Sequence, residues 1–144
     1  MTIPRDEPVG LLVARTAKTL TRAFNAELGT QGGSLTTWLV LASLKGGLHQ
    51  SQREIAEEVG VEGPTLTHHL NRMEENGLVT RVRDPRNRRV HQVELTPRGV
   101  QEFETLLGVV QGFDRRLRAG LTASELTTLR ELLRRLAEHV MTDR

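Results

Sequence analysis

Residues 51–77, SQREIAEEVGVEGPTLTHHLNRMEENG, decide the fold, because two short amphipathic helices follow one another with only a brief turn between them. Ser51 and a glutamate three residues later are spaced as a capping box, and Gly60 follows the first helix as a stop signal. A Gly-Pro pair opens the second helix, with Pro64 expected at the first helical position, and Gly77 ends it. This spacing predicts a helix-turn-helix.

The second helix of this pair divides into an apolar and a polar side when it is projected at about 100° per residue. The side expected to pack inward consists of Leu66, Leu70, Met73 and Gly77. The side expected to face outward consists of Pro64, His68, Asn71, Arg72 and Glu75. A helix in the major groove of DNA needs this division, because an apolar back anchors it while polar side chains reach bases and phosphates. An ordinary solvated helix face has the same pattern and remains an alternative.

Two strands are predicted immediately after this helix, over residues 78–84 and 89–95, where apolar residues alternate on either side of a polar turn. We expect Val82 on the first strand to share an inner face with Val93 and Leu95 on the second. The helix-turn-helix followed by this hairpin predicts a winged helix-turn-helix.

The hairpin has five arginines within nine residues, against a single acid, Asp84. Seven arginines and four acids fall within residues 64–98, so this segment is basic although the net charge of the whole chain is only +2. Arginine suits the narrow, negative minor groove because its guanidinium is flat and weakly hydrated. Arg81 and Arg83 are expected to meet phosphates from the strand, and the candidates for insertion into the groove are Arg86, Arg88 and Arg89. We expect Asp84 to pair with a loop arginine, and a merely solvated hairpin tip is the alternative.

Longer helices are predicted on both sides of this winged segment. One is expected over about residues 8–28, before a buried helix over 34–44. Two more follow the hairpin, the first starting at Thr96-Pro97 and the second capped by Thr122. The last helix has an apolar stripe formed by Leu126, Leu129, Leu133, Leu136 and Val140.

The fold class is therefore mainly α with a small β-hairpin wing, in which a winged helix-turn-helix lobe is joined to a helical dimerisation region. The expected parts are an N-terminal dimerisation helix over 1–33, the DNA-binding lobe over 34–96, and C-terminal dimerisation helices over 97–144. These end helices are more apolar than the lobe could bury by itself, so a homodimer is expected, with an intramolecular bundle as the alternative.

Composition narrows the function classes. The chain has no cysteine, which excludes disulfides and thiol catalysis. Neither a Ser/His/Asp constellation nor a phosphate-binding glycine loop is visible, so we expect no enzyme and no cofactor. The five histidines lack the spacing of metal ligands, so no metal site is expected. No secretory signal and no membrane-spanning apolar run are visible, which predicts a cytoplasmic protein without a membrane partner.

The run from residue 51 to 99, with SLTTWLVLASL before it and LTASELTTLRELLRRL after it, resembles the MarR family of bacterial transcription regulators. The resemblance implies a homodimer that binds a pseudo-palindromic operator in double-stranded DNA and acts as a repressor. It implies a recognition helix over 63–76, with Thr65, Thr67 and His68 near base edges and Arg89 in the minor groove. The other expected DNA contacts are Ser51, Gln52, Pro64, His69 and Arg72.

Two departures from the family pattern affect these expectations. His68 stands where many relatives have arginine, so the resemblance does not transfer a base preference. Asn87 replaces the aspartate that usually steadies the wing arginine, and Asp84 is the candidate substitute.

The resemblance also implies that a small aromatic or anionic effector releases the DNA. Arg15 and Trp38 are candidates to line its site, although a surface salt bridge for Arg15 and a core position for Trp38 are favoured. Two other functions remain open at this point. One is an architectural or weakly specific DNA-binding protein, and the other is a protein-interaction module on the same fold.

Overall fold

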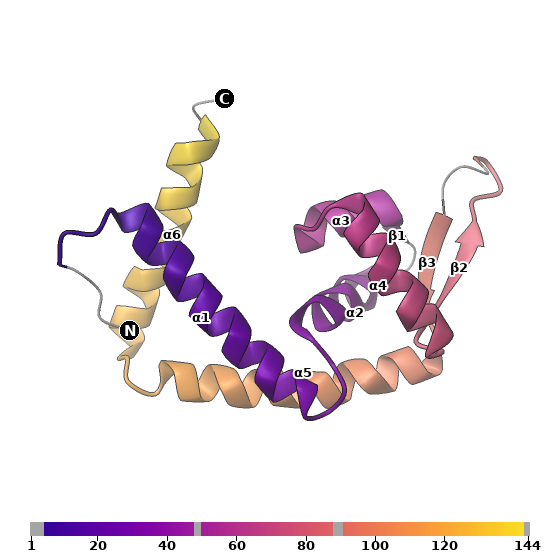
Figure 1. The fold of residues 1–144 in the computed structure, drawn as a ribbon, viewed down its shortest axis with the longest axis horizontal. Coiled ribbons are helices and arrows are strands. Elements are labelled where there is room, and N and C mark those ends of the chain that lie inside the picture. Colours follow the sequence, from indigo (N-terminus) through magenta and orange to yellow (C-terminus); the bar gives the residue numbers. More distant parts are fainter. Residues whose placement is uncertain (1–4, 48–49, 88–90, 143–144) are drawn as a thin grey trace. The chain divides into compact units, whose positions relative to one another are not determined.

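The computed structural model describes residues 5–47, 50–87 and 91–142 (Figure 1). Its elements, in chain order, are α1 (Val9–Gly29), α2 (Leu35–Gly46), β1 (Gln50–Ser51), α3 (Gln52–Val59), α4 (Gly63–Glu75), β2 (Val79–Arg83), β3 (His91–Leu95), α5 (Pro97–Arg118) and α6 (Ala123–Thr142). The mainly helical fold with a β-hairpin is confirmed, and the predicted helices and strands lie within a few residues of the observed ones.

The chain forms two compact units, residues 1–110 and 111–144, and the boundary falls within α5. The first unit contains the helix-turn-helix and the hairpin. The expected division by role into an end helix, a lobe and two further end helices stays a prediction. None of the described helices is long and apolar enough to cross a membrane.

The core of the first unit is almost wholly aliphatic, as a chain with so few aromatic residues requires. It consists of Leu28, Val40, Leu41, Leu44, Ile55, Leu66, Leu70, Met73, Leu78, Val79, Val93 and Leu106. Burial of each large aliphatic side chain stabilises the fold by about 1.5–3 kcal/mol. The members come from α1 to α5 and from both long strands, so this one cluster holds the helix pair against the hairpin.

The start and stop signals around the helix-turn-helix act as predicted. The Ser51 side chain accepts a hydrogen bond from the Glu54 N–H, and the Glu54 carboxylate accepts one from the Ser51 N–H, which completes the capping box of α3. Gly60 ends α3 with φ of 79°, a conformation that glycine adopts without steric cost. The start of α4 differs by one residue from the prediction, because Gly63 is its first residue and Pro64 its second.

The hairpin belongs to a three-stranded antiparallel sheet with the order β1-β3-β2. The register pairs Val79 with Leu95 and Arg81 with Val93. Val82 is therefore on the opposite face and is 49% exposed, so its predicted place beside the inner valine and leucine of β3 was wrong. Strand β1 was not predicted, because two residues are too few for an alternating pattern to show.

The N-terminus of α5 fixes the base of the hairpin. The Thr96 hydroxyl accepts a hydrogen bond from the Gly99 N–H and donates one to the Gly77 carbonyl oxygen. A Cβ on Gly99 would lie 2.1 Å from the backbone oxygen of Leu78, so only glycine allows the helix to approach this closely. The junction between α4, β2 and α5 is therefore tightly packed. Residues 79–95, which comprise β2, β3 and the segment between them, are called the wing below.

Candidate nucleic-acid interface

Helix α4 has the two sides that the sequence predicts. Leu66, Leu70 and Met73 are buried in the core. The outward residues are all exposed, namely Pro64, Thr65, Thr67, His68, Asn71, Arg72 and Glu75. Gly77 does not belong to the inner side, because it lies beyond the end of the helix and is exposed. Apart from Pro64, these exposed side chains can all form hydrogen bonds, and they are called the outward row below.

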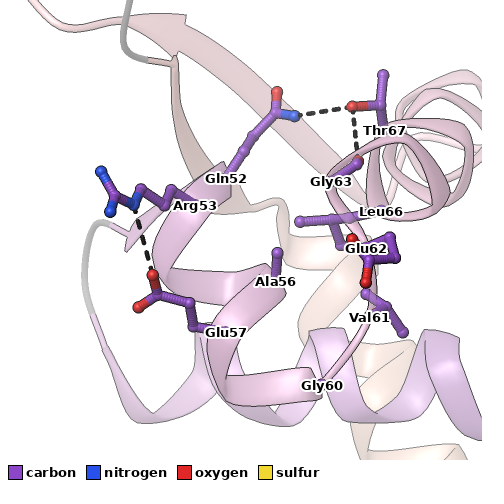
Figure 2. A pocket seen from close by; sticks show the side chains of 10 residues that line it. All are labelled: Gln52, Arg53, Ala56, Glu57, Gly60, Val61, Glu62, Gly63, Leu66 and Thr67. Atoms are coloured by element: carbon purple, nitrogen blue, oxygen red, sulfur yellow. Dashed lines mark hydrogen bonds and ion pairs between the residues drawn. The ribbon is translucent and has the colours of Figure 1, made fainter.

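Thr67 on this row is held in place by its neighbours (Figure 2). Its hydroxyl donates to the Gly63 carbonyl oxygen at 3.1 Å and accepts a hydrogen bond from the Gln52 side-chain amide at 3.4 Å. A cavity of about 580 Å³ opens between α3 and α4 beside this pair. Gln52, at the start of α3, therefore steadies the side chain of Thr67 on α4. The Ser51 hydroxyl accepts the capping hydrogen bond described above.

His69 is half-buried and faces a different surface from its neighbour His68. With Arg72 it lines a second cavity of about 270 Å³, together with Gly32, Gly33, Ser34, Thr37, Met73, Asn76, Leu78 and Glu102. Burial lowers the pKa of His69, and the charges of His68 and Arg72 lower it further. A neutral imidazole that lines a cavity is a poor candidate for a phosphate contact, so His69 does not join the outward row.

The arginines of the wing differ in their surroundings. Arg81 was expected to meet phosphates, but its guanidinium donates to the Asn71 side-chain oxygen at 2.6 Å and to the Glu74 carboxylate at 3.0 Å. Arg81 is on the inner face of β2, opposite Val93, where its side chain is only 18% exposed, so the phosphate contact expected of it stays a prediction that competes with these partners. Asn71 and Glu74 were not predicted as its partners, because their contact with Arg81 depends on how β2 meets α4.

Arg83 and Arg86 are exposed, and within the described residues neither forms an ion pair. The predicted contacts of Arg83 with phosphate and of Arg86 with the minor groove therefore stay predictions, and both side chains are accessible for them. Arg88 and Arg89 lie outside the described residues, so their predicted entry into the minor groove stays a prediction.

Asp84 shapes the turn of the wing through backbone contacts. Its carboxylate accepts a hydrogen bond from the Arg86 N–H at 2.8 Å, and its carbonyl oxygen accepts one from the Asn87 N–H at 3.2 Å. The expected pairing of Asp84 with a loop guanidinium is replaced by this turn, since a short acidic side chain at the start of a turn can reach the backbone N–H two residues later. Asp84 therefore stabilises the turn of the wing through backbone N–H groups and not through a guanidinium.

The two effector candidates have other structural partners. The Arg15 guanidinium pairs with Glu7 at 3.1 Å, and the Trp38 ring packs on the core and stacks on Phe103 with 6.2 Å between centroids. Neither residue lines the two cavities described above. In the parts of the chain that the structure describes, no group of three or more histidine, aspartate or glutamate side chains could hold a metal ion.

Comparisons with known proteins agree with this geometry. The model of the MarR family matches residues 34–91, which contain α2 to the start of β3. A MarR mutant from E. coli complexed with operator DNA is 27% identical, with a TM-score of 0.82 over 90% of this chain and 94% of that one. A probable transcriptional regulator from Pseudomonas aeruginosa is also 27% identical, with a TM-score of 0.82 over 92% of this chain and 99% of that one.

A third solved structure shows the fold alone, because its sequence is only 21% identical. It is BpsR of Bordetella bronchiseptica, whose DNA binding is regulated by 6-hydroxynicotinic acid, with a TM-score of 0.84 over 95% of this chain and 98% of that one. Over its helix-turn-helix and the first strand of its wing this chain matches the model of the MarR family of transcription regulators, and over nearly its full length it is similar to MarR structures.

Proposed function

We propose that this protein is a homodimeric, sequence-specific regulator that binds double-stranded DNA at a pseudo-palindromic operator and represses transcription. The observation that carries the proposal is the outward row of α4 beside the exposed Arg83 and Arg86 of the wing, within one compact unit. The row suits the major groove, since hydroxyl, imidazole and guanidinium groups can reach base edges. The wing arginines suit phosphates and the adjacent minor groove.

The relative from E. coli that was solved with operator DNA supports this proposal, because its fold matches most of this chain. Repression would follow from occlusion, since two lobes on one operator cover promoter DNA. In a dimer, the two half-site centres should be about one helical turn apart, roughly 10–10.5 base pairs.

Selection of bound fragments from genomic DNA tests this function. The protein should enrich a limited set of fragments that share an inverted repeat. On such a fragment its affinity should exceed that for bulk genomic DNA by about 10³ or more. Equal affinity for selected and bulk DNA would contradict sequence-specific regulation and favour an architectural role.

A homodimer is supported by the exposed apolar side chains outside the winged segment. None of the residues of α6 is buried in the single chain, and Leu129, Leu132, Leu133 and Leu136 recur along it at helical spacing, each at least 38% exposed. Apolar stripes of this kind mark surfaces that another protein covers. A second copy is the economical partner, because a two-fold axis covers the same stripe on both copies.

A small aromatic or anionic effector completes the proposal. The cavity lined by His69 and Arg72 adjoins the back of α4, so a ligand there could displace the helix that contacts DNA. The regulation of BpsR by 6-hydroxynicotinic acid supports this class of ligand. Aromatic carboxylates, with that acid as the first probe, should raise the melting temperature of the protein and release it from its selected fragment. If no aromatic carboxylate raises the melting temperature or releases the DNA, an effector of this class is contradicted.

A further inference from the structure

Arg81 joins the wing to helix α4 through two nitrogen atoms of its guanidinium. Its Nη2 atom lies 3.0 Å from Oε1 of Glu74 and 2.6 Å from Oδ1 of Asn71. Its Nε atom lies 3.4 Å from Oε2 of Glu74. The guanidinium therefore contacts both carboxylate oxygens and one amide oxygen, a two-point contact that fixes orientation as well as distance.

The three residues come from the two elements that meet the DNA in the proposed function. Asn71 and Glu74 are three residues apart on α4, so they lie on one side of that helix. Arg81 is the central residue of β2, and its backbone is fixed by pairing with Val93 in the sheet. Any rotation of the wing about its base must therefore break the contacts of this side chain.

The surroundings of Arg81 distinguish it from a phosphate contact. Its side chain is 18% exposed, whereas Arg83, two residues along the same strand, is exposed and has no ion pair within the described residues. The carboxylate of Glu74 is a negative charge on the helix that would approach a polyanion. Its side chain is 43% exposed, and Arg81 places a positive charge against it.

We propose that Arg81 is a positioning residue that sets the angle between the wing and α4, so that the two enter neighbouring grooves in one fixed register. This role rests on the proposed function of the chain in sequence-specific DNA binding. Because a fixed register favours the operator over other sequences, loss of the Arg81 contacts lowers selectivity more than it lowers affinity for DNA in general.

The test is a double-mutant cycle with Arg81→Gln, Glu74→Gln and the double variant, measured on a selected operator fragment and on bulk DNA. Each single change should lower the ratio of specific to bulk affinity by roughly tenfold, and the double variant should be no worse than either one, because the residues act as a pair. If Arg81 instead contacts phosphate, Arg81→Gln weakens binding to all DNA equally and Glu74→Gln strengthens it. That outcome would overturn the proposal.

Arg81→Lys separates charge from geometry. Lysine keeps the positive charge but lacks the planar fork, so the positioning role predicts a loss of selectivity close to that of Arg81→Gln. Retention of parental selectivity by the lysine variant would contradict it.

Arg83→Gln is the matched control on the same strand. It should weaken binding to operator and bulk DNA alike and reduce the slope of log affinity against log salt by up to about 0.9, as expected for one phosphate contact.

Hydrogen exchange on the protein without DNA tests the contact independently of DNA binding. In Arg81→Gln and Arg81→Lys, the amides of β2 and β3 should exchange at least about threefold faster, while those of α2 should keep their parental rates. Unchanged exchange in the wing would overturn the positioning role. If the parent protein instead fails to prefer any DNA fragment, the proposed function fails, and the exchange rates still decide whether Arg81 holds the wing.

Discussion

At the scale of single residues, a few side chains in this structure have roles that their types alone do not reveal. Arg81 and Arg83 are two positions apart on one strand, yet one binds the protein's own Glu74 and the other is exposed. His68 and His69 are adjacent, yet one is on the outward row of α4 and the other lines a cavity. The burial of each side chain and the groups around it decide whether it contacts the protein itself or solvent.

Gly99→Ala should lower the free energy of unfolding by about 1–3 kcal/mol, as overpacked sites do. The added Cβ would meet the Leu78 backbone oxygen, which cannot move without displacing the hairpin base. Chemical denaturation measures the change. Gly108→Ala on the same helix is the control, because its Cβ would have no neighbour within 4 Å. It should stabilise the protein by about 0.5–1 kcal/mol, and equal effects of the two changes would contradict the close packing.

His69 should make stability depend on pH in the mildly acidic range. Burial lowers its pKa, helped by His68 and Arg72, and the Glu102 carboxylate lines the same cavity. The unfolded chain therefore takes up a proton at higher pH than the folded chain does. Stability contributed by the neutral imidazole is present above the ordinary value of 6.5 and is lost as the pH falls below it.

The measurement is urea denaturation at several pH values from about 7.5 to 5, a range that spans the ordinary titration of histidine. His69→Gln should lose less stability on acidification than the parent. Thr65→Ala, on the exposed side of the same helix, is the control, since it removes no titrating group and should keep the parental dependence on pH. A parental slope in the His69 variant would show that another group is responsible.

At the scale of the element, the helix ends were predictable because capping depends on residues close together in the sequence. Ser51, Gly60 and Thr122 all act at the helix ends where their spacing placed them. The faces of β2 were not predictable from its own alternation, because Val79 and Val82 have opposite parity and either could lie inward. The pairing with β3 decides in favour of Val79.

Ser51→Ala should destabilise the protein by about 1 kcal/mol, the usual cost of losing an N-cap. The Ser51 side chain and N–H also hold the pKa of Glu54 below its ordinary value. A lowered carboxyl pKa contributes stability above the unfolded value that is lost as the pH falls. The variant should therefore differ less from the parent in acid. Thr105→Ala, which removes a hydroxyl from the exposed middle of α5, should leave stability almost unchanged at either pH.

At the scale of the whole molecule, the sequence predicted the class of the fold and the exposed side of α4, and predicted fewer of the contacts made by the wing. The outward row of α4 followed from helical periodicity, which needs no knowledge of other elements. The partners of Arg81 depend on how β2 meets α4, a long-range contact that local spacing does not encode. The role proposed for the apolar stripe on α6 likewise depends on a second molecule.

Leu133→Glu should convert the dimer to a monomer at micromolar concentration, because it places a charge in the centre of the exposed stripe of α6. Sedimentation equilibrium should give twice the chain mass of 16.1 kDa for the parent and the single mass for the variant. Thr127→Glu, which adds the same charge away from the stripe, should remain dimeric. A monomeric parent, or a dimeric Leu133 variant, would refute this interface.

In the proposed complex, α4 and the wing of one lobe occupy neighbouring grooves of a single duplex. Chemical footprinting on a selected operator tests it most directly, with methylation of guanine N7 for the major groove and hydroxyl radicals for the minor groove. If both elements bind, two major-groove protections should appear about one helical turn apart, each flanked by minor-groove protection that weakens in Arg86→Ala. Protection confined to one groove, or a minor-groove pattern unchanged in that variant, would contradict it.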